Sequence, residues 1–119
     1  MKPFRLTLAA LFAANGLWML FASRHWYGAL PGVIDSGPFN AHFVRDLGAV
    51  YLLCGTAFFA LARHAGARPY ALAACAFLLA HGAIHLLETL LDLHDLEHLL
   101  ADAPGVLLLP TLATWSAWR

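Results

Sequence analysis

The chain has 119 residues, of which 61% are hydrophobic and 12% are charged, whereas soluble domains average roughly 45–50% and 25%. Seven Lys and Arg residues balance seven Asp and Glu residues, and the sequence contains no basic block that would favour binding to nucleic acid. This composition disfavours a soluble protein. It predicts a single integral membrane domain covering residues 1–119, whose surroundings are the lipid bilayer.

Four apolar stretches predict an all-α fold, a bundle of four transmembrane helices. Each stretch reaches or nearly reaches the ~20 residues that a helix needs to cross a bilayer core of about 30 Å. The fourth is short, and Pro110 predicts a kink within it. The first also resembles a signal peptide, but its apolar run is longer than a usual signal core. The predicted spans cover residues 6–23, 41–62, 70–91 and 104–118.

Basic residues mark one side of the predicted membrane domain. They lie before the first span, between the second and third spans, and at the end of the chain, at Lys2, Arg5, Arg63, Arg68 and Arg119. Because short loops rich in Lys and Arg stay cytoplasmic, we expect both termini in the cytoplasm and the protein in the cell inner (plasma) membrane. The connections at 23–40 and 92–104 would then face the periplasm or the cell exterior.

The second predicted span begins with the stretch FNAHFVRDLG, which carries three ionisable residues on one face. His42, Arg45 and Asp46 fall within an arc of about 100° around the helix. Asn40 precedes them as a predicted N-cap, since its side chain can accept a hydrogen bond from a free amide of the first turn. These residues would lie in the outer leaflet, near the mouth of the bundle.

The third predicted span carries a longer polar stripe in HGAIHLLETLLD. Its ionisable residues fall within an arc of about 60°, at His81, His85, Glu88 and Asp92. Ionisable groups inside a membrane generally face the bundle and pair with one another, so we expect this stripe to face the polar start of the second span. Three small residues would let the helices approach closely: Gly48, Gly55 and Gly82.

Imidazole and carboxylate groups on facing helices are the ligands that helical bundles offer to metal ions. The sequence therefore predicts a transition metal ion, either iron, copper or zinc, as the cofactor. The predicted metal ligands are His42, His81, His85 and Glu88. Two further residues are predicted to act in catalysis. Arg45 would bind an anionic substrate or neutralise Glu88 or Asp92. Asp46 would orient a ligand histidine or bind the metal itself.

The leading functional hypothesis is a small membrane protein with this metal site in the outer leaflet, acting as a metal-dependent oxidoreductase on a small substrate. A first alternative is a non-catalytic accessory subunit of a larger membrane complex, in which the polar cluster holds two helices together. A second is a b-type haem protein with His42 or His85 as an axial ligand, although the nearby acidic residues disfavour it. The sequence leaves open whether the protein is an enzyme.

The connection after the third span contains HDLEH, in which His94, Glu97 and His98 match the H-x-x-E-H pattern of one metalloprotease group. Five residues are easily matched by chance, so a protease is disfavoured, but this segment could help to collect a metal outside the membrane. An ion relay is disfavoured because the polar stripe stops near His81. A bundle this short encloses little volume. We therefore expect a homo-oligomer or a partner membrane subunit, contacted through the glycines of the second span or the apolar back of the fourth.

Overall fold

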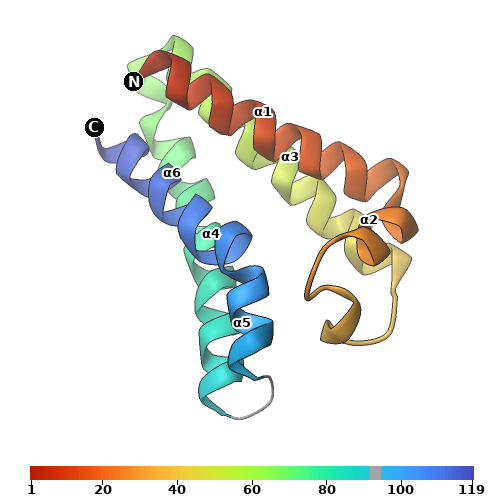
Figure 1. Cartoon of the computed structure of the whole chain (residues 1–119). Helices are drawn as coiled ribbons and strands as arrows, with labels where there is room; N and C mark the ends of the chain where they lie inside the picture. Colours follow the sequence, from red (N-terminus) through yellow and green to blue (C-terminus); the bar gives the residue numbers. More distant parts are fainter. Residues whose placement is uncertain (92–94) are drawn as a thin grey trace.

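The computed structural model describes residues 1–91 and 95–119, which form helices and no strand (Figure 1). The predicted all-α fold is therefore confirmed. Asp92 and His94, two of the polar residues of the sequence patterns, lie outside the described residues. In chain order the elements are α1 (Lys2–Phe21), α2 (Ser23–Ala29), η1 (Ile34–Ser36), α3 (Ala41–Arg63), η2 (Ala65–Ala67), α4 (Arg68–Leu90), α5 (Leu96–Ala103), η3 (Pro104–Leu108) and α6 (Leu109–Trp118).

Four helical segments of the described residues are long and apolar enough to cross a membrane, which confirms the predicted number of membrane-length helices. The fourth begins at Leu96 rather than at residue 104, because α5, η3 and α6 follow one another without a break. Much of the predicted outer connection is thus part of a membrane-length helix. The four segments cover Lys2–Phe21, Ala41–Arg63, Ala65–Leu90 and Leu96–Trp118.

The helices form two hairpins arranged as a V (Figure 1). In the first hairpin α1 packs along α3, and in the second α4 packs along the continuous helix of α5, η3 and α6. The hairpins meet at the end that holds both termini and the connection between α3 and α4, which we call the terminal end (Figure 1). They diverge toward the opposite end, which we call the distal end. Among the described residues, the distal halves of the long helices of the two hairpins therefore lie farther apart than their terminal halves (Figure 1).

Close contact between α1 and α3 depends on glycine. A Cβ added to Gly16 would lie 2.6 Å from the carbonyl oxygen of Gly48, and one added to Gly55 would lie 3.0 Å from that of Ala9. Such short backbone distances need residues without side chains, as in other membrane helix pairs. The expected close approach at Gly48 and Gly55 is confirmed, but the partner is α1 rather than the third span. These glycines are consequently not free to contact another subunit.

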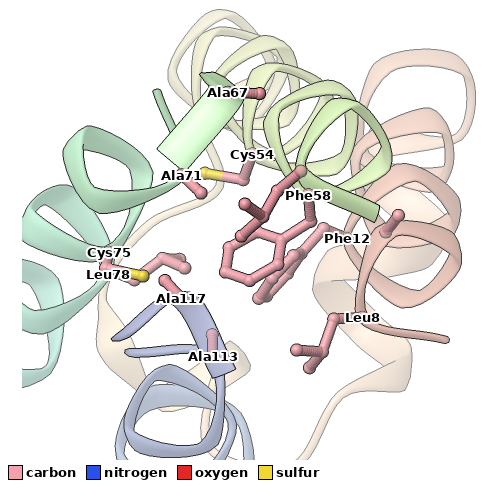
Figure 2. Packing of buried hydrophobic residues seen from close by; sticks show 12 residues of the cluster. Leu8, Phe12, Cys54, Phe58, Ala67, Ala71, Cys75, Leu78, Ala113 and Ala117 are labelled. Atoms are coloured by element: carbon pink, nitrogen blue, oxygen red, sulfur yellow. The ribbon is translucent and has the colours of Figure 1, made fainter. Parts of the chain in front are cut away.

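A buried apolar cluster joins the two hairpins at the terminal end (Figure 2). Phe12 of α1 and Phe58 of α3 lie at its centre, with ring centroids 5.6 Å apart. Ala113 and Ala117 of α6 lie opposite these rings (Figure 2) and are fully buried. Because alanine side chains are small, α6 can come close to the aromatic rings. This cluster fixes how the hairpins sit relative to each other.

Two arginines hold the end of α6 at the same place. Arg5 donates hydrogen bonds from Nε and Nη2 to the carbonyl oxygen of Ser116, over 3.3 and 3.0 Å. Arg68 donates from Nη2 to the carbonyl oxygen of Trp118, over 3.2 Å. The last carbonyl groups of a helix have no partner within the helix and carry the negative end of its dipole, so cationic donors stabilise them. The starts of α1 and α4 are thereby tied to the end of α6.

Candidate metal site

Three possible metal ligands lie together at the distal end of the second hairpin. His85 comes from α4, and His98 and Asp102 come from α5. Each side chain offers one ligand atom, and the three atoms lie within 4.8 Å of one another. The side chains are 19%, 9% and 7% exposed, respectively. Two antiparallel helices thus place three ionisable groups in a largely buried position.

Two of the three distances between the ligand atoms are close to those found around a single small cation. Nδ1 of His85 lies 2.9 Å from Oδ2 of Asp102, and Nε2 of His98 lies 3.2 Å from the same oxygen. Around an ion with bonds of about 2.1 Å, neighbouring ligand atoms are about 3.0–3.4 Å apart. Two imidazole nitrogens and one carboxylate oxygen also form a known donor set for iron and zinc. The three residues therefore offer a donor set that could hold such an ion.

The start of α5 places two of the three ligands. Asp95 is its N-cap, and the Asp95 carboxylate accepts a hydrogen bond of 2.8 Å from the backbone amide of His98. This cap satisfies one of the free amides of the first turn and fixes where the helix begins. Asp102 follows His98 by four residues, so the two side chains lie on one face of the helix. The cap therefore sets the direction of both ligands toward α4.

Close to the site, α4 crosses η3 at Gly82, and this contact sets the distance between the two helices. Pro110 has no amide hydrogen to donate to the carbonyl of Val106, the acceptor four residues earlier, and the backbone at Pro104–Leu108 is a π-helix. That carbonyl lies against Gly82, where an added Cβ would overlap the Val106 oxygen and lie 3.3 Å from the carbonyl carbon. Gly82 is one turn before His85 on α4. The expectation of close helix approach at Gly82 is confirmed, with η3 as the partner.

The connection between α2 and α3 reaches the site from the other hairpin. Gly32 has a φ of 82°, and a Cβ added there would overlap Oδ1 of Asp102 and lie 3.1 Å from its Cγ. The backbone of this connection therefore covers the Asp102 carboxylate. Here the first hairpin lies against one of the three grouped residues, Asp102.

The other polar residues of α4 flank the site. The His81 ring lies edge-on to the His85 ring, with centroids 4.9 Å apart, and is stacked on Phe77 at 6.2 Å. Glu88 is half-buried and lies one turn after His85. Of the four predicted ligands, the structure therefore places His81, His85 and Glu88 along one side of α4, and places His85 among the grouped ligand atoms.

The polar residues of the second predicted span lie elsewhere. Nε2 of His42 is 3.3 Å from Oδ2 of Asp46, but the two side chains are 88% and 66% exposed, and Arg45 is exposed as well. The expectation that these residues face the polar stripe of the third span is wrong. The reason is that α3 buries its glycines against α1, and the two hairpins diverge at this end (Figure 1). The predicted catalytic residues and His42 are therefore separate from the grouped ligands.

Asp102 was not among the predicted ligands, and His98 was considered only within HDLEH as a residue that could collect a metal outside the membrane. The reason is that the sequence pattern placed both residues in a connection ending at Pro104. The helical signal was nevertheless present. Asp95 is a good N-cap residue, and the leucines that follow it recur at helical spacing, at Leu96, Leu99 and Leu100. A proline near the start of an apolar run usually marks the first turn of a helix. Pro104 therefore suggested a start at residue 104, whereas the helical segment begins at Leu96.

Comparisons with models of protein families, with curated proteins and with solved structures find no match for this chain. The functional argument therefore rests on the positions and chemistry of its own residues.

Proposed function

We propose that this protein resides in the inner (plasma) membrane and binds one transition metal ion through His85, His98 and Asp102. The convergence of both histidines on a single carboxylate oxygen, within 2.9 and 3.2 Å, carries the proposal. Burying ionisable groups in membrane helices is costly unless they pair or coordinate a metal. A bound ion would compensate this cost for all three groups at once.

The donor set supports iron or zinc as the ion. Structural zinc sites normally have four protein ligands, whereas catalytic sites keep a position open for water or substrate. Three protein ligands at this site would leave such a position. Two histidines and one carboxylate are also the ligand set of non-haem iron enzymes, which supports the hypothesis of an oxidoreductase acting on a small substrate.

The distribution of charge supports a site on the outer side of the membrane. Both termini lie at the terminal end together with the connection between α3 and α4 (Figure 1), and the basic residues Arg63 and Arg68 flank that connection. Short basic segments remain cytoplasmic. In this orientation the distal end, with the proposed metal site, faces the periplasm or the cell exterior.

Metal binding by the purified protein in detergent tests the proposal. We expect about one ion of iron or zinc per chain, and saturable binding of Co²⁺ with visible absorption bands from nitrogen and oxygen ligands. Removing a ligand with His98→Ala or Asp102→Asn should weaken binding by more than the about 10- to 100-fold that outer groups contribute. A Soret band in the isolated protein would instead favour the haem alternative.

His42→Ala is the matched control. His42 and Asp46 form the same histidine–aspartate pair at the same spacing, 3.3 Å apart, but in an exposed position. This variant should bind metal like the unchanged protein. If the protein binds no metal, and His98→Ala lowers its thermal stability equally with and without added ions, the cluster is an interhelical network. That result would contradict the proposal and support the accessory-subunit alternative, which co-purification of a partner membrane subunit would test further.

A further inference from the structure

The turn that covers the site has a defined geometry. Its four residues are Leu30, Pro31, Gly32 and Val33, and the amide of Val33 donates to the carbonyl of Leu30 over 3.4 Å. Proline at the second position and a φ of 82° at the third are the features of a type II turn. A φ in this range is readily adopted by glycine and rarely by residues with side chains. The sequence LPGV therefore specifies this turn locally, independently of the metal site.

The turn is held in place by the first hairpin. The hydroxyl group of Tyr27 donates to the carbonyl oxygen of Ile34 over 3.0 Å, and it also contacts that of Gly37. The Tyr27 ring packs edge-on against Phe39, with centroids 5.3 Å apart. These contacts fix the segment after the turn to α2 and to the start of α3. Gly32 is thus presented to Asp102 on an ordered loop.

The two carboxylate oxygens of Asp102 have different neighbours. Oδ2 is the atom that lies 2.9 Å from His85 and 3.2 Å from His98. Oδ1 lies against Gly32, at the position that a Cβ would occupy, and a Cβ there would also be 3.5 Å from Oδ2. Rotation of the carboxylate would move Oδ1 away from the turn and Oδ2 away from the histidines.

We propose that Gly32 is a positioning residue of the metal site. By lying directly against Oδ1, the turn holds the Asp102 carboxylate so that Oδ2 alone faces the two histidines and binds the ion through one oxygen. Groups outside the ligand set commonly orient metal-binding carboxylates through hydrogen bonds, and here a close packing contact would restrict the carboxylate instead. The inference rests on the proposed function. It adds that the first hairpin, which supplies none of the three grouped ligands, determines how well they bind.

The test compares Co²⁺ and Zn²⁺ binding by three glycine variants of the full-length protein in detergent. Gly32→Ala adds a Cβ that displaces Oδ1, and we expect the affinity to fall by about 10- to 100-fold with a changed Co²⁺ absorption spectrum. Gly32→Asn should have the same effect with less backbone strain, because asparagine tolerates positive φ. Gly37→Ala is the matched control, since Gly37 also has a positive φ, of 142°, in the same connection but has open space around its Cβ position.

The outcomes separate this inference from the proposed function. If the unchanged protein binds no metal, the proposed function fails. If it binds metal and Gly32→Ala has the same affinity and the same Co²⁺ spectrum, the positioning role is refuted while the metal site stands. Equal weakening by Gly37→Ala and Gly32→Ala would also refute the positioning role, because strain in the connection would then explain both.

Discussion

On α5, Nε2 of His98 lies 3.2 Å from Oδ2 of Asp102, four residues later. On α3, Nε2 of His42 lies 3.3 Å from Oδ2 of Asp46, at the same spacing. The first pair is covered by α4 and by the turn at Gly32, whereas the second is exposed. Both pairs have the same residue types at the same spacing, so the sequence alone does not distinguish them. What distinguishes them is the element packed over each pair, which depends on how distant segments meet.

Burial at the terminal end can be tested at Phe58, which is fully buried and packed against Phe12. Phe58→Ala should lower the free energy of unfolding by about 3–5 kcal/mol, because it removes packing contacts and leaves a cavity. Reversible unfolding in mixed detergent micelles measures this change. Phe59→Ala, at the adjacent but 53% exposed position, is the control. Equal losses in the two variants would contradict the position of the core.

An N-cap next to an apolar run made the start of α3 predictable. Asn40 caps α3 as predicted, and its side chain accepts a hydrogen bond of 3.1 Å from the amide of Phe43. The start of the fourth span was missed although Asp95 caps it in the same manner. The difference is Pro104, which normally begins or breaks a helix but here starts a π-helical turn inside one. Because the sequence does not reveal this π-helical turn, His98 and Asp102 are predicted to lie in a connection rather than in a helix.

The crossing of α4 and η3 gives a prediction for Gly82. Gly82→Ala would place a Cβ against the carbonyl of Val106, so the two helices must separate. We expect a loss of stability of about 1–3 kcal/mol, as for other overpacked positions, and weaker metal binding because His85 moves with α4. Thermal unfolding and Co²⁺ titration measure the two effects. Gly105→Ala, in the π-helix that Gly82 faces but with open space around its Cβ position, should lower neither the stability nor the metal affinity. Unaltered stability in Gly82→Ala would contradict the close crossing.

At the scale of the whole molecule, the number of spans followed from the sequence but their pairing did not. Four apolar helices offer several possible pairings, and the pairing found here depends on backbone contacts at Gly16, Gly48 and Gly82. Hydropathy carries no information about which glycine meets which backbone. For this reason the prediction that the polar face of the second span meets that of the third is wrong, and the sequence did not predict the V-shaped arrangement.

The proposed orientation in the membrane can be tested by labelling single cysteines. In a background without Cys54 and Cys75, which are both buried, Asp35→Cys lies exposed at the distal end and Gly66→Cys lies exposed at the terminal end. A membrane-impermeant maleimide added to intact cells should label the first and spare the second, because basic segments remain cytoplasmic. Both should react after lysis. Labelling of Gly66→Cys alone in intact cells would reverse the orientation.

The buried cluster shown in Figure 2 joins all four long helices at the terminal end, whereas the buried residues of the distal cluster, Met19, Trp26 and Val44, all belong to the first half of the chain. Stability is therefore unevenly distributed. Regions with few shared contacts open locally at a lower free energy than global unfolding requires. Within the described residues, the distal parts of α4 and α5 can consequently open locally while the terminal end stays folded. An ion bound at that end would oppose this local opening, since ligands stabilise the conformation to which they bind.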